Sequence, residues 1–480
     1  MVRIRFIHFV GIKGVGMTPL AIIAKEAGCK VTGSDIEDEF ITDISLKKAG
    51  IIPFVNFLKE HVGNVDLVIT TGAHGGFENI EVQYAKSKNI PVMTQGEAVG
   101  VFMDGKIFNT KFIGISITGS HGKTTTSAMI ATIFKENHLD PSYLVGSGSI
   151  FPLDLPGHFG KGNYFIAEAD EYATEPKYDK TPKFLWQHPK IEVFTNIEFD
   201  HPDFFNSLEE IKEAFLNFAK QLPRQGLLVG CGDDQGVKEI IKKLDKDVIT
   251  YGFSPLNDYQ LIKVNSSFDQ TFFWVEKKGI SLGEFNLGVS GEHNALNALG
   301  ATVVALEIGI PLEKIKNTLK VFKGTKRRLE YVGKLPTGAL LFDDYAHHPT
   351  EIQQTLKAFR QDFPKSKIVC IFQPHTYSRT KKLFEDFICS FNNADEVAIS
   401  NIYPSLREKP DSSVSSKLLV EGISKFHKNV LFLPELKDVV EYIEQKAYSK
   451  DVVVLTMGAG DIYKISQKLI PIKSGLKVNS

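Results

Sequence analysis

Residues 117–129 read ITGSHGKTTTSAM, a stretch that places one lysine between a glycine and three threonines. The apolar run FIGISIT leads into it, and the helical pattern SAMIATIFKEN continues from it. A Gly-rich turn between a strand and a helix points backbone N–H groups at an anion, so Lys123 is predicted to contact nucleotide phosphates and Thr124 to bind Mg²⁺. The spacing Gly119-x-x-Gly122-Lys-Thr is two residues shorter than the usual P-loop, so an ordinary turn with a helix N-cap is the alternative. The flanking strand and helix favour the phosphate site.

Acidic residues follow two other buried strand patterns of the same region. NYFIAEADEY ends in Glu168, Asp170 and Glu171, and FTNIEFDHPD ends in Asp200, His201 and Asp203. Open α/β sheets collect ligands at the carboxyl ends of their strands. Acids at a strand end are often only solvated, but two such ends beside one phosphate turn predict a Mg²⁺ site with oxygen ligands and one imidazole.

A second glycine-rich turn lies near the start of the chain. HFVGIKGVGM follows a strand pattern and resembles a dinucleotide fingerprint, with Lys13 at the position of its second glycine. Asp35 lies about twenty residues further on, at the end of the next strand pattern, where an acid usually meets a ribose or base. The pattern is compatible with a nucleotide diphosphate and does not demand a nicotinamide. A purely structural tight turn is the alternative.

Two polar clusters end strand patterns near the other end of the sequence. LFDDYAHHPTEI carries Asp344 and His348, and FQPHTYSRT carries His375 and Arg379. Upstream of both, TKRRLE offers Arg327 and Arg328, and we expect such an arginine either to be a solvated connector residue or to reach the γ-phosphate on domain closure.

Composition narrows the class of protein. A chain of 480 residues predicts about three domains. The 56 Lys and Arg against 57 Asp and Glu give a net charge of −1, so no global field favours nucleic acid or an anionic membrane. Four widely spaced cysteines favour a reducing compartment. With no signal-peptide pattern and no membrane-spanning apolar run, the sequence predicts a cytoplasmic protein.

The order of the patterns predicts an α/β fold with three domains. Short β-rich runs alternate with helical patterns throughout, which is typical of parallel sheets. We expect a Rossmann-like domain over residues 1–107, a central P-loop ATPase-like domain with a mostly parallel sheet over 108–323, and a Rossmann-like C-terminal domain over 324–480.

Several of these motifs, in this order, resemble those of the Mur ligase family of peptidoglycan synthesis. The resemblance covers nearly the whole chain and rests on HFVGIKGVGM, TGSHGKTTT, EADE, NIEFDHPD, GEHNALNAL, KRRLE, DDYAHHPTEI, FQPHTYSRT and GAGDI. It implies a ligase that uses ATP and Mg²⁺ to join L-alanine to the lactyl carboxylate of UDP-N-acetylmuramate through an acyl phosphate. It also implies that the three domains bind the UDP-sugar, ATP and the amino acid, in that order.

The resemblance assigns roles to individual residues. It implies that ATP contacts Thr118, Gly119, Ser120, His121, Gly122, Lys123, Thr124, Thr125, Asn294, Asn297, Arg328 and Asp344. It implies a UDP-sugar site at Gly11, Lys13, Gly14, Val15, Gly16 and Asp35. It implies metal ligands at Thr124, Glu168 and His201, and acceptor contacts at His348, His375 and Arg379. The residues expected to carry catalysis are Lys123, Glu168, His201, Arg328 and Asp344.

Three alternatives remain at this level. The ligase that attaches a whole tripeptide to the same UDP-sugar is the nearest one, because EADEYATEPKYDKTPKF is also similar to that branch. A non-catalytic nucleotide-binding switch would use the phosphate turn without ligation, although the N-K-x-D base reader of guanine switches is absent from the sequence. An oxidoreductase built on the first glycine-rich turn would leave the turn around Lys123 unexplained.

Overall fold

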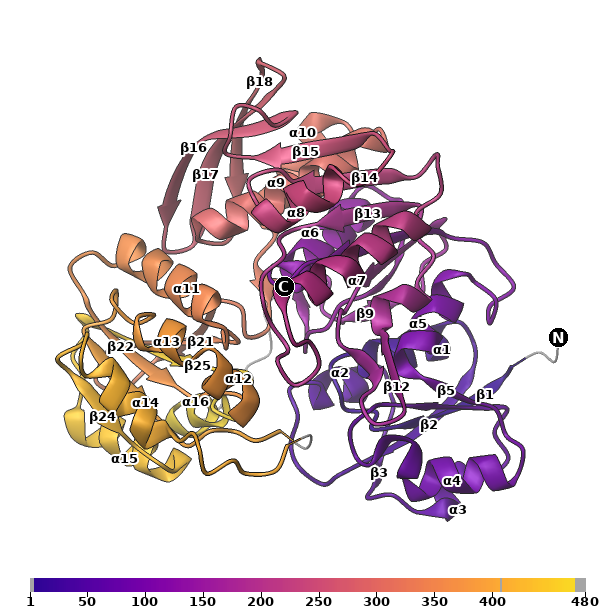
Figure 1. Cartoon of the computed structure of the whole chain (residues 1–480), viewed down its shortest axis with the longest axis horizontal. Helices are drawn as coiled ribbons and strands as arrows, with labels where there is room; N and C mark the ends of the chain where they lie inside the picture. Colours follow the sequence, from indigo (N-terminus) through magenta and orange to yellow (C-terminus); the bar gives the residue numbers. More distant parts are fainter. Residues whose placement is uncertain (1–3, 406–407, 471–480) are drawn as a thin grey trace. The chain divides into compact units, whose positions relative to one another are not determined.

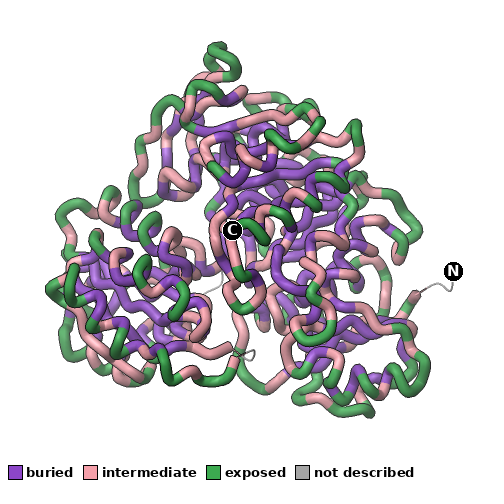
Figure 2. The backbone as a smooth tube through the Cα atoms, viewed as in Figure 1, coloured by how far each residue is buried: buried purple, intermediate pink, exposed green. Residues whose placement is uncertain are grey.

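The computed structural model describes residues 4–405 and 408–470 and divides into two compact units. The first unit comprises the chain up to Asn265 together with Asp269–Lys326, and the second comprises Ser266–Phe268 and the chain from Arg327 onward. In both units the strands are mostly buried and the exposed residues lie on the outer turns and helices (Figure 2). The division lies three residues beyond the boundary predicted at 323/324, and the boundary expected at 107/108 stays a prediction.

The N-terminal part of the first unit is a five-stranded parallel sheet (Figure 1). Its strand order is β3-β2-β1-β4-β5, so the order reverses between β1 and β4, where open α/β sheets bind ligands. Its strands are β1 (Phe6–Val10), β2 (Lys30–Asp35), β3 (Phe54–Val55), β4 (Leu67–Thr70) and β5 (Val92–Thr94). Its helices are α1 (Thr18–Glu26), α2 (Asp43–Lys48), α3 (Lys59–Val62), η1 (Gly76–Glu78), α4 (Ile80–Ser87) and α5 (Gln95–Met103).

The rest of the first unit is built on a ten-stranded sheet of order β18-β17-β16-β15-β14-β13-β6-β10-β7-β9. The pairs from β16 through β15, β14, β13, β6 and β10 to β7 are parallel, whereas β17–β18 and β7–β9 are antiparallel. The strands are β6 (Ile113–Thr118), β7 (Ser142–Leu144), β9 (Gly157–His158), β10 (Tyr164–Glu168), β13 (Ile191–Phe194), β14 (Leu227–Cys231), β15 (Val248–Gly252), β16 (Tyr259–Ser267), β17 (Gln270–Lys277) and β18 (Ile280–Leu287). Two small antiparallel sheets pair β8 (Ile150–Phe151) with β19 (Gly324–Thr325) and β11 (Ala173–Glu175) with β12 (Asp179–Pro182).

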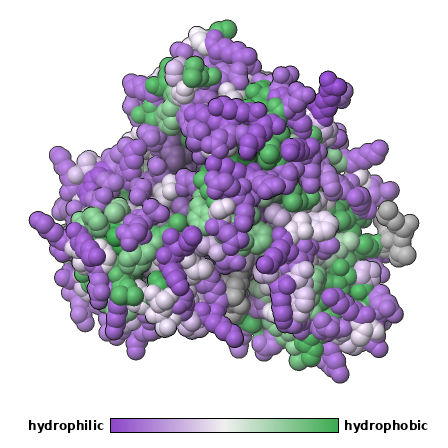
Figure 3. Space-filling model, viewed as in Figure 1, coloured by the Kyte–Doolittle hydropathy of each residue, from purple (hydrophilic) through white to green (hydrophobic). Residues whose placement is uncertain are grey.

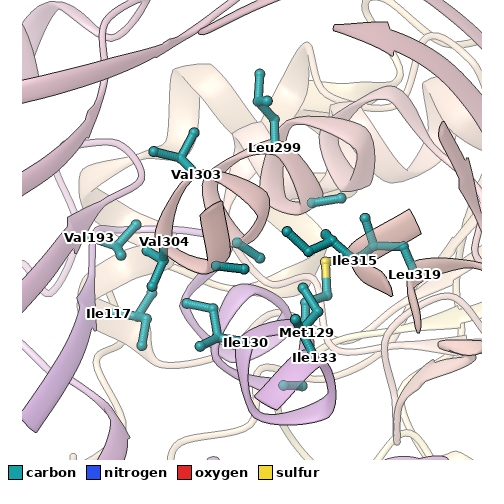
Figure 4. Packing of buried hydrophobic residues seen from close by; sticks show 14 of the residues in the cluster. Ile117, Met129, Ile130, Ile133, Val193, Leu299, Val303, Val304, Ile315 and Leu319 are labelled. Atoms are coloured by element: carbon teal, nitrogen blue, oxygen red, sulfur yellow. The ribbon is translucent and has the colours of Figure 1, made fainter. Parts of the chain in front are cut away.

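Helices pack on this sheet through apolar faces. They are α6 (Lys123–Glu136), η2 (Lys183–Trp186), α7 (Leu208–Gln221), α8 (Gln235–Ile241), α9 (Glu292–Glu307) and α10 (Leu312–Val321). Figure 4 shows Met129 of α6 close to Ile315 of α10, within one cluster of buried apolar side chains that also includes Ile130, Ile133, Leu299 and Leu319. Burying such side chains stabilises the fold by about 1.5–3 kcal/mol each, and it fixes the start of α6, which carries Lys123.

The second unit is a six-stranded sheet of order β20-β21-β25-β22-β23-β24, in which only β20–β21 is antiparallel. Its strands are β20 (Glu330–Lys334), β21 (Leu340–Asp344), β22 (Lys367–Phe372), β23 (Glu396–Ile399), β24 (Val430–Phe432) and β25 (Val452–Met457). Its helices are α11 (Pro349–Asp362), α12 (Tyr377–Lys382), α13 (Phe384–Ile388), α14 (Ser416–Ile423), α15 (Leu436–Lys446) and α16 (Lys464–Leu469). The predicted α/β class with mostly parallel sheets is thus confirmed.

The visible face of the molecule is mostly hydrophilic, with smaller apolar patches between the polar side chains (Figure 3). Within residues 4–405 and 408–470, no helix combines the length and the apolar character that crossing a bilayer requires.

One buried acid makes the stability of the fold depend on pH. Glu192 of β13 lies in the middle of the central sheet, fully buried, and neither of its oxygens has a hydrogen-bond partner among the described residues. Burial raises the pKa of this carboxyl from 4.5 to about 8, although Lys246 opposes the shift. A raised folded-state pKa contributes stability that is complete below the unfolded-state pKa and is lost as the pH rises through the folded-state value.

We therefore expect the melting temperature of the wild-type protein to fall between about pH 5 and pH 8 relative to that of a Glu192→Gln variant, which cannot ionise there. Thermal melts of both proteins across this range measure the difference. Parallel curves for the two proteins would contradict the raised pKa.

Candidate active site

The predicted phosphate turn connects β6 to α6 and has a backbone that only glycine adopts easily. Gly119 has φ +139° and Gly122, the N-cap of α6, has φ +81°. A Cβ atom on Gly119 would overlap the Thr195 hydroxyl, and the turn is held further by a bond from the Ser120 amide to the Asn196 carbonyl at 3.0 Å. The amide of His121 donates to Oδ1 of Asn196 at 2.9 Å. Residues after β13 therefore shape the turn after β6.

Lys123, the first residue of α6, folds its side chain back over this turn. Its ammonium group donates to the carbonyl oxygens of Gly119 and Ser120 and to both carboxylate oxygens of Glu171, at 3.1 and 2.9 Å. The Lys123 side chain is 15% exposed and that of Glu171 is 3% exposed. Burial alone would lower the pKa of Lys123, but the Glu171 and Asp170 carboxylates outweigh it and raise that pKa above its usual value. A permanent positive charge is thus held at the turn.

Thr124 and Glu168 meet beside Lys123, as the sequence predicted for two metal ligands. The Thr124 hydroxyl donates to Oε2 of Glu168 at 3.1 Å, and the amide of Gly146 donates to Oε1 at 2.6 Å. Both carboxylate oxygens are therefore oriented at the carboxyl end of β10. The next residue of the helix, Thr125, is also buried.

A second group of possible metal ligands follows β10 and β13. Asp170, Glu171 and His201 each offer one ligand atom, and these atoms lie within 4.8 Å of one another. Nε2 of His201 lies 3.5 Å from Oε1 of Glu171. Burial would raise the pKa of Asp170, but Lys183, which donates to its carboxylate at 2.7 Å, and Lys123 hold that pKa well below its usual range. The structure therefore brings His201 to Asp170 and Glu171 in one cluster.

Asn294 and Asn297, two of the ATP contacts that the resemblance implies, lie at the start of α9, beside the phosphate turn. Oδ1 of Asn297 would lie 2.5 Å from a Cβ atom on Gly122, so the amide packs directly on the turn. The side-chain amide of Asn294 donates to the Ser290 carbonyl at 2.6 Å. By contrast, the Thr118 hydroxyl is fully buried and donates to the Ala169 carbonyl at 3.0 Å, so it ties β6 to the end of β10.

The turn after β1 also has the expected glycine geometry, with Gly11 at φ +79°. Asp35, at the end of β2, is fully buried and accepts hydrogen bonds from the amides of Lys13 at 2.7 Å and Ile36 at 2.8 Å. The Lys13 ammonium donates to the carbonyls of Ile36 at 3.0 Å and Asp38 at 2.8 Å. Gly14, Val15 and Gly16 complete the turn before α1, and Gly14 accepts from the amides of Met17 and Thr18 at 2.9 Å. The acid and the lysine thus build the turn that was predicted to hold the diphosphate.

The second unit places Asp344 at the carboxyl end of β21, where it is almost fully buried. Its carboxylate accepts from the amides of Leu329 at 2.7 Å and Ala346 at 2.8 Å. Burial raises the pKa of this carboxyl to about 6 against the opposing charge of Arg328. Arg328 lies 3.5 Å from Glu351 and packs over the ring of Tyr345.

The adjacent arginine, Arg327, has a different environment. It is buried, donates to Asp343 at 2.8 Å and also bonds the carbonyls of Gly458 and Gly460. It therefore holds β20, β21 and the segment after β25 together. The sequence offered both arginines of TKRRLE, and the structure buries the first and leaves the side chain of Arg328 28% exposed.

The predicted acceptor residues gather at the carboxyl ends of β21 and β22. Nη1 of Arg379 lies 3.1 Å from Nδ1 of His375, and the His375 ring lies 5.8 Å from that of His347. His348, next in the chain, is the N-cap of α11 and accepts from the Thr350 amide at 3.3 Å. His348 therefore caps α11, the helix that follows β21.

Comparison with known proteins places these features in a family. Family models match residues 6–107 (Mur ligase family, catalytic domain), 117–305 (Mur ligase middle domain) and 327–460 (Mur ligase, glutamate ligase domain). The chain belongs to the Mur ligase family of ATP-dependent ligases. The predicted family is therefore confirmed, and a non-catalytic switch or an oxidoreductase does not fit it.

Particular relatives are similar over the full length. The chain is 40% identical to the UDP-N-acetylmuramate–L-alanine ligase of Desulfitobacterium hafniense, over 97% of this chain and 99% of that protein. It is 39% identical to the protein of the same name from Caldanaerobacter subterraneus, over 98% of each. The solved UDP-N-acetylmuramate-alanine ligase of Thermotoga maritima is 29% identical and superposes with a TM-score of 0.80 over 97% of this chain and 98% of that one. A murein peptide ligase of Psychrobacter arcticus, 24% identical over 97% and 98% of the two chains, shares the fold with a TM-score of 0.71.

Proposed function

We propose that this protein joins L-alanine to the lactyl carboxylate of UDP-N-acetylmuramate at the expense of ATP, in the synthesis of peptidoglycan precursors. The names of its full-length relatives support these substrates. The observation that carries the ATP-dependent chemistry is the turn around Lys123, whose ammonium is held charged by Glu171 beside the oriented Thr124 and Glu168.

The reaction needs two displacements, because a carboxylate is a poor electrophile. A carboxylate oxygen of the sugar attacks the γ-phosphorus of ATP, the bond to the bridging oxygen breaks, and ADP leaves. The amine of L-alanine then attacks the acyl carbon of the acyl phosphate, loses a proton, and phosphate leaves as the amide forms. Negative charge builds on phosphate oxygens in the first displacement, so the Lys123 charge and the N-terminus of α6 stabilise it there.

The same site has the chemistry of a Mg²⁺ centre. Thr124 and Glu168 would hold one ion, and Asp170, Glu171 and His201 form a second group of hard oxygen donors with one imidazole. An ion held by these residues would supply positive charge beside the phosphate oxygens.

The remaining predicted residues divide among the ligands. Asn294 and Asn297 would contact the base of ATP, and Ser120 and His121 its phosphates. Gly11, Lys13, Gly14, Val15 and Gly16 would form the diphosphate turn of the UDP-sugar, on a backbone anchored by Asp35. In the second unit, Arg328 and Asp344 would serve ATP, and His348, His375 and Arg379 the acceptor amino acid. We place the reaction in the cytoplasm, because none of the four cysteines, all within the described residues, forms a disulfide.

We expect the purified protein to release phosphate only when ATP, Mg²⁺, UDP-N-acetylmuramate and L-alanine are all present. A coupled phosphate assay with each component omitted in turn measures this. Glycine, L-serine and the tripeptide L-alanyl-γ-D-glutamyl-meso-diaminopimelate then replace L-alanine in parallel reactions. Turnover with the tripeptide and none with L-alanine would overturn the assignment in favour of the tripeptide ligase.

A further inference from the structure

The antiparallel hairpin β11–β12 leaves the central sheet directly after the acids at the end of β10. Its first strand begins two residues after Glu171, the partner of Lys123, and η2 follows its second strand. Figure 1 shows β12 beside elements of the N-terminal sheet. The hairpin therefore connects, along the chain, the ATP site with a surface of the preceding domain.

That surface is the loop after β4, and it fits the hairpin closely. A Cβ atom on Gly76 would overlap the Glu175 carboxylate, and one on Gly72 would lie 2.8 Å from Cδ of Pro176. Side-chain bonds surround this contact, because Glu78 accepts from the Lys177 ammonium and from the Tyr178 hydroxyl, the latter at 2.6 Å. Nothing larger than a glycine hydrogen is accommodated at Gly76 without moving Glu175.

The same loop adopts an unfavourable backbone next to the predicted UDP-sugar turn. His74, Gly75 and Gly76 all have positive φ, at +54°, +86° and +52°. A left-handed conformation at a residue with a side chain is costly and persists only where its surroundings enforce it. The contact between Glu175 and Gly76, two residues from His74, constrains the loop in this way.

The enforced conformation places His74 against the UDP-sugar turn. Nε2 of His74 lies 3.4 Å from Oδ1 of Asp35, and its Cδ2 would lie 3.3 Å from a Cβ atom on Gly11. Asp35 in turn accepts from the Lys13 amide at 2.7 Å. A continuous set of contacts thus runs from Glu175 of the hairpin through Gly76 and His74 to the turn after β1, at the position where the strand order reverses.

We propose that hairpin β11–β12 is a positioning element for the UDP-sugar site, in which Glu175 sets the loop at Gly76 and the loop sets His74 against Asp35 and Gly11. Glu175 and His74 are positioning residues that act through the glycine turn. This inference rests on the proposed function, because it takes the turn after β1 as the binding site of a UDP-sugar. It assigns the central domain a direct part in binding the ligand of the domain before it.

The first test replaces Gly76 by alanine and uses Gly28→Ala as its matched control. Gly28 lies in the same domain, also has positive φ, at +92°, and has open space where its Cβ would lie. We expect Gly76→Ala to raise KM for UDP-N-acetylmuramate about tenfold, with KM for ATP and kcat at saturating sugar within about twofold of wild type. Gly28→Ala should leave all three constants near wild type. Equal KM values for the sugar in the two variants would overturn the proposal.

Two further comparisons separate positioning from general destabilisation. Glu175→Ala removes the carboxylate that packs on Gly76 and should raise the same KM on its own, and the double variant Gly76→Ala/Glu175→Ala should add little to either single change, because both act through one contact. His74→Ala should raise the same KM, and His74→Gln, which has the same backbone cost and retains a donor toward Asp35, should restore it. If Gly76→Ala does not fold, the His74 pair decides the question, and indistinguishable KM values for these two variants would refute the proposal.

Failure of the proposed function has a different signature. In that case wild-type protein shows no calorimetric binding of UDP-N-acetylmuramate and no turnover with it, before any variant is compared. If the wild-type protein binds the UDP-sugar and Gly76→Ala has an unchanged KM, the positioning role of the hairpin is rejected and the proposed function stands.

Discussion

Replacing Lys123 by alanine is expected to abolish ligation while leaving the binding of UDP-N-acetylmuramate intact. Lys123 places its ammonium group over the phosphate turn, and its charge is held there by Glu171. Removing a preorganised charge that stabilises the transition state costs about 10²–10³ in kcat, and the loss of ATP phosphate contacts adds to it. The predicted UDP-sugar turn lies on a separate sheet, after β1. Phosphate release measures the first effect and calorimetry with the UDP-sugar the second.

The design of this experiment has to separate chemistry from folding. Without Lys123, the Glu171 carboxylate is a buried charge that has lost its closest partner, so the single variant should melt at a lower temperature. Glu171→Gln in the same chain should restore the melting temperature without restoring turnover. Lys48→Ala, which removes an exposed ammonium paired with Asp154, should leave turnover unchanged. Loss of UDP-sugar binding together with turnover in Lys123→Ala would contradict the separation of the two sites.

The parts of the site that the sequence predicted are those set by strand ends. Parallel strands align their carboxyl ends, so a phosphate turn after one strand and acids after two others had to meet, and β6, β10 and β13 are indeed neighbours. The need for Gly119 and Gly122 was equally predictable from the sequence. The turn passes so close to Thr195 and Asn297 that it has no room for a Cβ atom.

The sequence did not predict which of several adjacent residues makes a given contact. EADE holds three acids, and which of them pairs with Lys123 depends on the direction of each side chain after the strand has ended. The structure selects Glu171, which the sequence had placed at the strand end without a role. Likewise nothing in TKRRLE distinguishes the buried Arg327 from the partly exposed Arg328, because the burial of Arg327 depends on Asp343 and on carbonyls more than a hundred residues away.

Contacts between loops far apart in the chain were also not predicted from the sequence. No strand was predicted over residues 173–182, and their partners in the loop after β4 lie about a hundred residues earlier. For Lys13, the resemblance implied a place in the UDP-sugar site. In the structure its ammonium group donates to two carbonyl oxygens of the next loop, and residue spacing alone does not predict these contacts.

Replacing Glu168 by glutamine is the second change expected to remove most of the activity. Its carboxylate is oriented by Thr124 at 3.1 Å and by the Gly146 amide at 2.6 Å, so a bound cation would meet a fixed negative charge. Glutamine keeps the volume and one acceptor oxygen but loses the charge that attracts Mg²⁺. We expect kcat to fall about 10²–10³-fold, in line with the loss of one preorganised electrostatic group.

Metal binding gives this prediction a readout apart from turnover. Mn²⁺ titrated into the protein with a non-hydrolysable ATP analogue and followed by electron paramagnetic resonance should bind Glu168→Gln more weakly than wild type. Glu210→Gln, at an exposed acid in the first turn of α7 whose carboxylate accepts from the Asn206 amide, should bind Mn²⁺ as wild type does. Because glutamine can still accept from Gly146, the melting temperature should change little. A Glu168→Gln variant with wild-type Mn²⁺ affinity would show that the charge needed for phosphoryl transfer lies elsewhere, with Asp170, Glu171 and His201 as the remaining group of donors.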